Sequence, residues 1–414
     1  MTRRARLLVL TVLYAGQYLA MSPLTALPAI LRDDGASLRQ VGAVSLVNFM
    51  VIAKVLWAPL VDRYGRRPRG HYRTWLAVTQ PSIVVMLLVL AAVDVRADFT
   101  LLMVGACVLG ALIGTQDIAA DGLAVRLIAP ADRGRVNAVQ VGAGFAGAAI
   151  GGVGLLTLVE YVGWSWAVSA LAGLCLLPLA VLRHIEEPVE PLRGTDGSAV
   201  LPGVRAVRTL ACRPGVAAWA GVLVPLVWTG IMLPQSLIGP LLVDRGWPLG
   251  RIGLLTVFLG GVAGIVGASG TGRLVGRHGR VRVLAGAFLV QLAATGALLA
   301  VATGAGGAVA AVAVAPLGLA RGALNTMIFT VFMDFCRPET AGTDFTLMSA
   351  WGFAVAVLAQ AVGPPLAGAV GYAAAVVVAG TLTAAALLWV RVLCARESPA
   401  VLSGGPEHAV QDAR

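Results

Sequence analysis

The chain has 414 residues, of which 58% are hydrophobic and only 12% are charged, and its formal net charge is +11. Together with a mean hydropathy of +0.86, these values exclude an ordinary water-soluble domain of this length. Most of the basic residues flank apolar runs. The positive charge therefore indicates membrane topology and is no evidence for a nucleic-acid partner.

Apolar runs of about 20 residues recur along the chain and predict twelve transmembrane spans. The predicted fold class is an all-α membrane protein, because backbone groups in lipid must satisfy their own hydrogen bonds. The predicted spans are residues 7–31, 41–61, 75–94, 100–125, 137–159, 164–182, 215–242, 252–272, 283–302, 308–333, 347–369 and 371–392.

The first span follows Arg3-Arg4-Ala5-Arg6, a basic start that also occurs in signal peptides. Its apolar run is longer than a normal signal core, so we expect an uncleaved first helix. Tyr14, Gln17 and Tyr18 share one face of this helix.

The second span contains Lys54, the only lysine in the chain. A cation near the bilayer centre costs roughly 3 kcal/mol on insertion scales, and such residues usually face a protein interior or a water-filled pathway. The alternative is that Lys54 extends to the interface near Asp62. That interface is about 12 Å away along a helix, roughly twice the reach of a lysine stem. Lys54 is therefore a candidate functional residue.

Several patterns argue against a cofactor or metal. The segment Gly142-Ala-Gly144-Phe-Ala-Gly147 matches a nucleotide-binding pattern, but it lies inside a span with no preceding strand and is interpreted as a helix-packing face, like Gly260-x-x-x-Gly264. The histidines all fall in cytoplasmic segments, and the cysteines form no close pair. We expect no disulfide framework, metal site or cofactor. The cysteines are Cys107, Cys175, Cys212, Cys336 and Cys394.

The arginines predict the orientation. With the N-terminus inside, most of them fall in the N-terminal tail, in the cytoplasmic loops and in the C-terminal tail. The external segments hold only Arg32, Arg39, Arg96, Arg245 and Arg251. Both termini are therefore predicted to be cytoplasmic.

The chain also repeats itself. Met21-Ser-Pro23 matches Met232-Leu-Pro234, and Leu60-Val61-Asp62-Arg63-Tyr64-Gly65-Arg66 matches Leu274-Val275-Gly276-Arg277-His278-Gly279-Arg280 at nearly the same offset. This repetition predicts two pseudo-symmetric six-helix bundles. The expected domains are residues 1–182 and 214–393, with a cytoplasmic linker at 183–213 and a cytoplasmic tail at 394–414.

Two such halves resemble the major facilitator superfamily. Asp62-Arg63-Tyr64-Gly65-Arg66-Arg67 is similar to the signature loop of that superfamily. The resemblance implies that Asp62, Arg63, Gly65, Arg66 and Arg67 form a cytoplasmic gate. The pattern would begin with Gly where this chain has Ala58, and the second copy has Gly276 in place of an acid, so we expect the second loop to gate less tightly.

Three further segments narrow the resemblance. Lys54-Val-Leu-Trp57-Ala-Pro59-Leu60, Thr115-Gln116-Asp117-Ile118-Ala119-Ala120-Asp121 and Pro130-Ala-Asp132-Arg133-Gly134 are similar to the AmpG-like muropeptide permeases and to the rhizobactin and pyochelin siderophore permeases. Ala341-Gly342-Thr343-Asp344-Phe345-Thr346 resembles the siderophore branch more.

Counting along the helices places Lys54, Asp117 and Arg321 at similar depths, about 20–25 Å from the outer ends of their spans. In the superfamily, spans 1, 4, 7 and 10 line a central cavity, so the resemblance implies that Asp117 and Arg321 face each other. One interpretation is a structural ion pair. We favour an anion-binding site, because two cations and one acid leave a positive cavity. The expected substrate-binding residues are Tyr14, Gln17, Lys54, Asp117, Trp228, Arg321 and Asn325, with Asp117 also carrying the coupling proton.

The predicted function is a secondary transporter of the bacterial cytoplasmic membrane that imports an iron-loaded siderophore by alternating access, coupled to protons. Import of a carboxylate-bearing muropeptide fragment is the alternative, and an efflux permease or a membrane-embedded enzyme is more remote. The chain has no nucleotide-binding P-loop and no H-E-x-x-H or G-x-S-x-G motif. We expect a monomer whose partners are the small anionic solute and membrane lipid.

Overall fold

The computed structural model describes residues 3–33, 40, 47, 50–64, 70–95, 98–150, 154–183, 185, 187, 209–213 and 215–396, and every regular element in these ranges is a helix. Ten of these helical segments are long and apolar enough to cross a membrane. They correspond to ten of the predicted spans. The other two, 41–61 and 137–159, lie partly outside the described residues.

The described chain forms two compact units. The first, here called the N-unit, consists of described residues within 1–129, 146–208 and 336–350. The second, the C-unit, consists of those within 130–145, 209–335 and 351–414. Each unit thus contains a short segment from the other half of the sequence.

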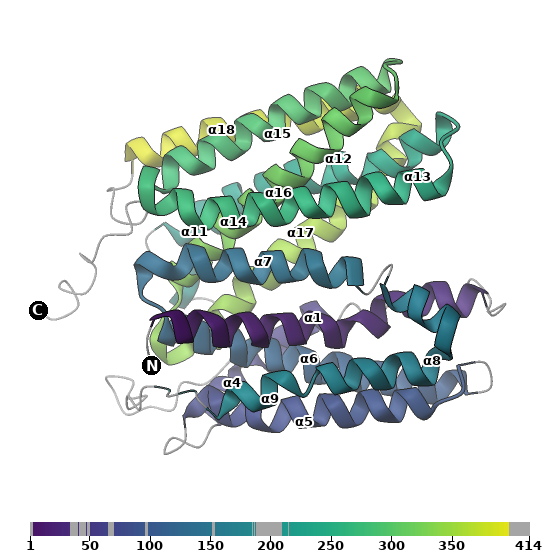
Figure 1. Ribbon diagram of the computed structural model, residues 1–414. Helices are drawn as coiled ribbons and strands as arrows, with labels where there is room; N and C mark the ends of the chain where they lie inside the picture. The colour runs from purple at the N-terminus through teal and green to yellow at the C-terminus, as the bar shows by residue number, and fades with distance from the viewer. Residues whose placement is uncertain are drawn as a thin grey trace, which may run out of the picture. The chain divides into compact units, whose positions relative to one another are not determined.

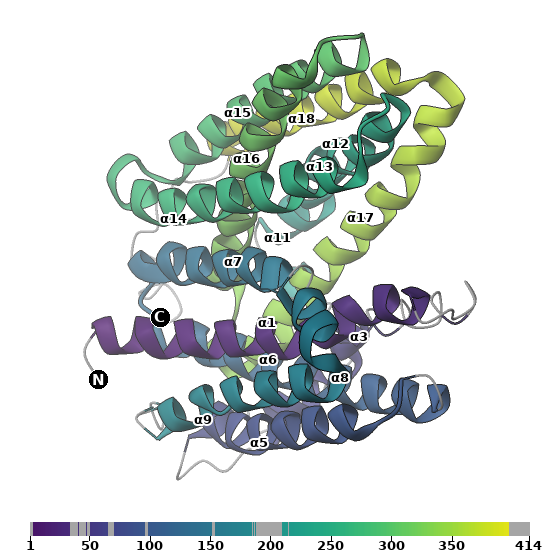
Figure 2. The ribbon, with the colours of Figure 1, turned by 45° about the vertical axis from the view of Figure 1, so that its right-hand side comes forward.

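The N-unit is built around a shared apolar core to which Leu27, Leu87 and Leu109 contribute. Within it α5 packs against both α6 and α8, and α1 packs against α6 and α8 (Figures 1 and 2). Its elements are α1 (Arg3–Asp33), α3 (Met50–Ala53), η1 (Lys54–Leu56), α4 (Ala58–Arg63), α5 (His71–Ala92), α6 (Phe99–Leu127), α8 (Leu155–Leu174), α9 (Leu177–Leu182) and η7 (Pro338–Thr340).

The second predicted span is not one continuous helix. The α-helix α3 ends at Ala53, a 3-10 turn covers Lys54 to Leu56, and α4 begins after Trp57. Pro59 provides the cause, because it has no N–H to continue the helical hydrogen bonds and its ring is best accommodated in the first turn of a new helix. The break therefore falls at the lone lysine.

The C-unit contains a second apolar core that includes Leu241, Leu298 and Leu317. In it α16 packs against α14 and α15, and α18 packs against α12 and α15 (Figure 1). Its elements are η3 (Pro130–Asp132), α11 (Val216–Ala218), η5 (Trp219–Leu223), α12 (Val224–Asp244), α13 (Leu249–Gly253), η6 (Leu254–Leu259), α14 (Gly260–His278), α15 (Arg280–Ala302), α16 (Gly307–Phe335) and α18 (Tyr372–Arg396).

Two helices contribute to both units. The helix α7 (Arg133–Ala149) lies mostly in the C-unit, and α17 (Ala341–Val370) begins in the N-unit and continues in the C-unit. The starts of these two helices are therefore packed among residues from the opposite half of the sequence.

Glycines bring α14 and α16 into backbone contact. A Cβ atom on Gly318 would collide with the carbonyl oxygen of Gly260, and one on Gly322 would collide with that of Gly264. The predicted role of Gly260-x-x-x-Gly264 in helix packing is confirmed, since only small residues allow so close an approach.

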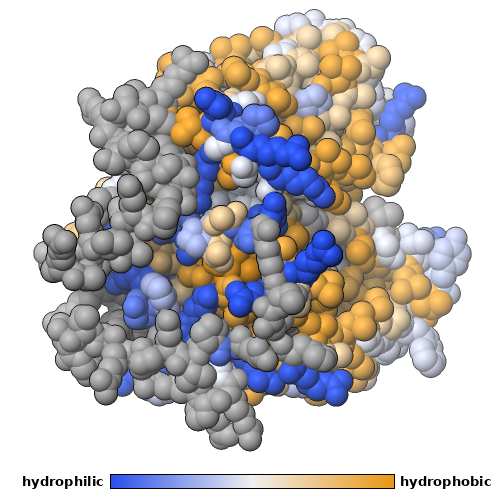
Figure 3. Space-filling view, turned by 60° about the vertical axis from the view of Figure 1, so that its left-hand side comes forward, coloured by the Kyte–Doolittle hydropathy of each residue, from blue (hydrophilic) through white to orange (hydrophobic). Residues whose placement is uncertain are grey.

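Large apolar side chains also cover the outside of the helices. On α5, Val78 is 59% exposed and Val85 is 60% exposed. Figure 3 shows extensive apolar surface at the top and on the right of the view, and hydrophilic residues on the face turned to the reader. Apolar surface of this extent is expected of helices that face lipid.

Candidate functional site

The N-unit holds a buried polar cluster around Asp117 of α6. Lys54 forms an ion pair with one oxygen of this carboxylate, and the amide nitrogen of Gln17 on α1 donates a hydrogen bond to the other. The side chain of Lys54 is 1% exposed and that of Asp117 is 16% exposed. A buried lysine is tolerable here because the partner carboxylate compensates its charge.

Neighbouring polar groups hold this cluster in place. The hydroxyl of Tyr14 donates a hydrogen bond of 2.9 Å to Asp121, one turn beyond Asp117 on α6. Trp57, directly after the 3-10 turn, donates its indole N–H to the hydroxyl of Thr115 at 3.0 Å. The structure therefore brings Gln17, Lys54 and Asp117 together, and it places Tyr14 on Asp121 instead.

One buried polar residue beside this cluster was not predicted. Gln116 is 1% exposed, and neither its amide nitrogen nor its amide oxygen has a hydrogen-bond partner among the described residues. Unsatisfied buried amides are rare, because each unpaired group costs about 1–3 kcal/mol. The signal available in the sequence was an amide in a transmembrane segment, directly before the charged Asp117.

The C-unit contains Arg321, which has no ion-pair partner among the described residues. Its guanidinium lies 4.8 Å from the ring centroid of Phe145 on α7, and its buried Nε atom has no hydrogen-bond partner there. The Phe145 ring in turn lies against Gly264 of α14, where any side chain would collide with it. Cation–π contact stabilises Arg321 but leaves its donors available.

Two other predicted residues lie in the C-unit. Asn325 follows Arg321 by one helical turn, and its buried Oδ1 atom has no hydrogen-bond partner among the described residues. Trp228 of α12 is 3% exposed, and its ring centroid lies 5.7 Å from that of Phe353. Its buried indole N–H also has no hydrogen-bond partner in the described part of the chain. That these residues and the Asp117 cluster act on one substrate stays a prediction.

Asp62, the acid of the signature loop, lies near the end of α4 and contacts the start of α17. One oxygen of Asp62 accepts the backbone N–H of Thr343 at 2.7 Å, and the other accepts the hydroxyl of Tyr72 at 2.7 Å. The Tyr72 hydroxyl accepts the N–H of Gly342 at 3.1 Å. A carboxylate at a helix N-terminus satisfies free N–H groups and interacts favourably with the helix dipole.

A charged pair lies beside the contact between Asp62 and α17. Arg126 of α6 lies 5.2 Å from the Tyr72 ring centroid and forms an ion pair of 2.8 Å with Glu187. Burial raises the pKa of the Asp62 carboxyl, and hydrogen bonds from Thr343 and Tyr72 offset part of that shift. Arg63 is exposed. The predicted gate residues Gly65, Arg66 and Arg67 lie outside the described residues.

The corresponding contact in the C-unit uses a different acid. Gly276, which replaces the acid in the second loop, would have open space around an added Cβ atom. Asp334, near the end of α16, instead forms ion pairs with Arg133 at the start of α7, at 2.8 Å, and with Arg280 at the start of α15. The sequence repeat did not identify Asp334, because the second acid lies outside the repeated loop.

Comparison with known proteins matches residues 7–360 to the Major Facilitator Superfamily. The chain is 26% identical over 287 residues to the anhydromuropeptide permease of Escherichia coli strain K12, a match covering 68% of this chain and 57% of that relative. It is 22% identical over 263 residues to the putative transporter AmpG 4 of Rickettsia felis, covering 61% of this chain and 63% of that protein. The chain thus spans less than two thirds of either curated relative.

Solved structures share the fold. The E. coli fucose:proton symporter FucP has a TM-score of 0.72 at 16% identity, covering 94% of this chain and 98% of that one. The human organic anion transporter MFSD10 has a TM-score of 0.72 at 18% identity, covering 94% and 100% of the two chains. The match over residues 7–360 establishes that the chain belongs to the Major Facilitator Superfamily, and ten helices of its described residues are long and apolar enough to cross a membrane.

Proposed function

We propose that this protein imports a small anionic organic solute across the inner membrane by alternating access. The solute class that we favour is a carboxylate-bearing muropeptide fragment. This was the alternative to a ferric siderophore, and it is the better supported of the two because relatives are named for anhydromuropeptide transport and for AmpG. We further propose a monomer with twelve transmembrane helices, cytoplasmic termini and two halves at 1–182 and 214–393.

Arg321 is the observation that carries this proposal. A guanidinium that is partly buried, stacked on Phe145 and not paired with an acid of the described residues retains donors for an incoming anion. Asn325 adds a side-chain amide on the same face of α16. Arginine binds carboxylates through two parallel hydrogen bonds, which suits the free carboxylates of a peptide-bearing sugar.

The Asp117 cluster supplies a means of coupling. Protonation of Asp117 would remove the charge that compensates Lys54 and would therefore break the ion pair. The proposal assigns coupling to Asp117 and substrate binding to Arg321 and Asn325, with Gln17, Lys54, Tyr14 and Trp228 as additional contacts. Asp62 and its loop provide the cytoplasmic gate.

Transport in proteoliposomes tests the proposal. The purified protein is reconstituted, a proton gradient is imposed, and uptake of radiolabelled anhydromuropeptide is compared with uptake of a 55Fe-loaded siderophore. We expect gradient-dependent accumulation of the muropeptide and none of the siderophore. Accumulation of the siderophore alone would overturn the proposed substrate class.

Variants of two arginines separate binding from general charge effects. Arg321→Gln is expected to reduce uptake at least tenfold, because charge-assisted hydrogen bonds contribute about 1.5–3 kcal/mol. The matched control is Arg245→Gln, since Arg245 is exposed and donates to the carbonyl of Ala302 at 2.7 Å. Equal uptake by both variants would remove Arg321 from the binding site.

A further inference from the structure

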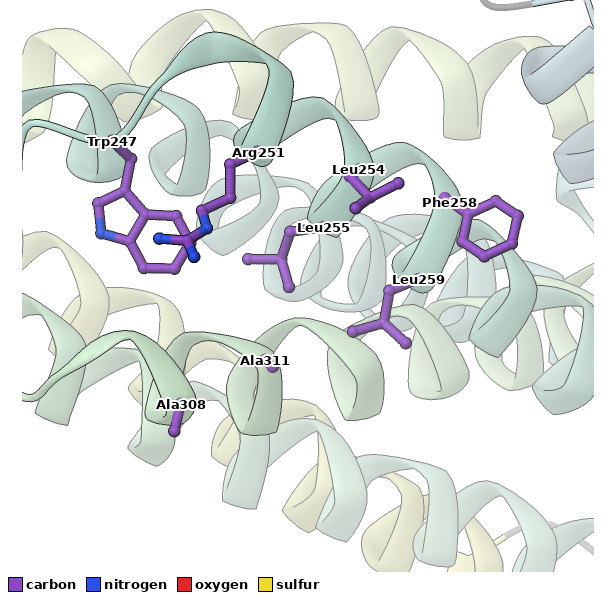
Figure 4. Close-up of a pocket in the computed structure, with 8 residues that line it drawn as sticks. All are labelled: Trp247, Arg251, Leu254, Leu255, Phe258, Leu259, Ala308 and Ala311. Atoms are coloured by element: carbon purple, nitrogen blue, oxygen red, sulfur yellow. The ribbon is translucent and has the colours of Figure 1, made fainter.

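A groove of about 510 Å³ opens on the C-unit between η6 and α16. Its walls are mostly apolar, with leucine and phenylalanine side chains on η6 and small alanines on α16 (Figure 4). Arg251 and Trp247 lie together at one end, and Phe258 lies toward the other. The lining residues are Trp247, Arg251, Leu254, Leu255, Phe258, Leu259, Ala308 and Ala311.

The groove begins next to Gly260, where the backbone contact between α14 and α16 ends. Gly260 is the first glycine of α14 whose backbone meets α16, at Gly318. Before Gly260 the chain is a π-helix, a wider turn that often marks a functional site. On the opposing wall α16 offers only Ala308 and Ala311, which are too small to fill the space. The opening is therefore a consequence of the sequence on both sides.

Arg251 gives the groove a charged end. Its guanidinium lies 5.3 Å from the Trp247 ring centroid, and it makes no ion pair with a described residue. Asp244, an acid at the end of α12, already accepts the hydroxyl of Tyr372 at 2.7 Å. An exposed guanidinium stacked on an indole is oriented to bind an anion at this end.

The η6 wall of the groove continues into an exposed apolar surface, which is typical of helices that face lipid. Leu254 is 67% exposed and Phe258 is 65% exposed, and the exposed apolar stripe extends along α14 through Val262 and Val266. Trp and Arg are typical anchors at the membrane interface, where an aromatic ring and a cation meet lipid headgroups. Hydrocarbon therefore has direct access to the groove, and a headgroup has access to its charged end.

We propose that this groove binds one anionic phospholipid of the bilayer. An acyl chain lies along Leu255 and Leu259 over the alanines of α16, and the phosphate binds Arg251 beside Trp247. The proposal does not depend on the identity of the transported solute, since the groove lies on residues that the transport site does not use.

Photo-crosslinking tests it directly. The full-length protein is reconstituted in vesicles of phosphatidylcholine containing a small fraction of phosphatidylglycerol with a diazirine in one acyl chain, and labelled peptides are identified by mass spectrometry. We expect labelling concentrated on residues 251–259 and 308–311. Labelling spread evenly over all lipid-facing helices would overturn the proposal.

Matched substitutions on α16 provide the control. Ala311→Phe fills the groove and is expected to reduce labelling of 251–259 at least fivefold. Val312→Phe adds bulk at a 62% exposed position that does not line the groove and is expected to leave labelling unchanged.

Arg251→Gln is expected to remove the preference for phosphatidylglycerol over a phosphatidylcholine bearing the same diazirine chain. Equal labelling of Ala311→Phe and Val312→Phe would refute the site, as would an unchanged headgroup preference in Arg251→Gln. Size-exclusion elution identical to that of the wild type selects the variants that are compared, and Ala308→Phe replaces Ala311→Phe if the latter aggregates.

Discussion

Asp62 accepts the backbone N–H of Thr343 although the two residues are 281 positions apart in the sequence. The bond joins the signature loop to the first turn of α17, and Tyr72 bridges the same carboxylate to Gly342. The signature loop belongs to the N-terminal half of the sequence and α17 to the C-terminal half. Their contact lies within the N-unit, which includes the start of α17. It is the contact that the proposed cytoplasmic gate would have to release.

The first prediction concerns that bond. Asp62→Asn should release the start of α17, because an amide lacks the charge that interacts with the helix N-terminus, a loss of about 1 kcal/mol. Cys336, 7% exposed and just before η7, reports the release. We expect maleimide to label Cys336 about five times faster in the variant, in a background in which Cys212 and Cys394 are replaced by serine.

A second acid provides the control for the gate. Asp98→Asn changes an exposed residue before α6, far along the sequence from α17, and should leave the labelling rate unchanged. Identical labelling rates in Asp62→Asn and the unsubstituted background would show that the contact does not hold the start of α17 in place.

The second prediction concerns the C-unit. Asp334→Asn should loosen the starts of α7 and α15, because it leaves Arg133 and the buried Arg280 without their carboxylate. We expect a lower melting temperature and slower transport. Gly276→Asp should change neither, since an added Cβ atom there meets nothing within 4 Å and Asp334 already pairs with both arginines. A gain in stability from Gly276→Asp would show that the missing loop acid, and not Asp334, limits this contact.

The third prediction uses two glycines on one helix. A Cβ atom at Gly267 would collide with the carbonyl oxygen of Leu319, whereas one at Gly270 would meet nothing within 4 Å. Both changes to alanine gain helix propensity, up to about 1 kcal/mol. Gly270→Ala should therefore raise the melting temperature slightly, and Gly267→Ala should lower it by several degrees. If both variants gain stability, α14 and α16 are not in the backbone contact described.

Much of this fold was predictable, and the reason is physical. Spans such as 283–302 are long apolar runs that only a helix satisfies in lipid, so composition alone fixes their type and approximate ends. The cost of a buried cation indicated that Lys54 faces the protein interior, but its ion pair with Asp117 was only the alternative to the favoured anion-binding site. The 3-10 turn at Lys54 was missed, although Pro59 was a usable signal for a break.

Other features required tertiary packing. The stacking of Arg321 on Phe145 depends on Gly264 making room for the ring, and no spacing rule connects these three residues. Asp334 joins helix starts that are remote in sequence, so its role appears only when α7 and α15 are placed beside α16. The burial of the Gln116 amide also depends on packing, because only the packed helices show that it has no hydrogen-bond partner among the described residues.

The last prediction separates coupling from structure at Asp117. If Asp117 carries the proton, Asp117→Asn should abolish accumulation against a gradient while solute still equilibrates across the membrane. A purely structural acid predicts a different result, namely loss of folded protein, because removing one partner leaves Lys54 as an uncompensated buried charge at a cost of about 3–5 kcal/mol. The double variant Lys54→Gln with Asp117→Asn distinguishes the two, since it removes both charges. We expect the double variant to fold and to equilibrate solute without accumulating it, measured as uptake in proteoliposomes with and without an imposed proton gradient. Proton-driven accumulation by either variant would exclude Asp117 from coupling and direct the search to Asp121, the next acid on α6, which accepts the hydroxyl of Tyr14.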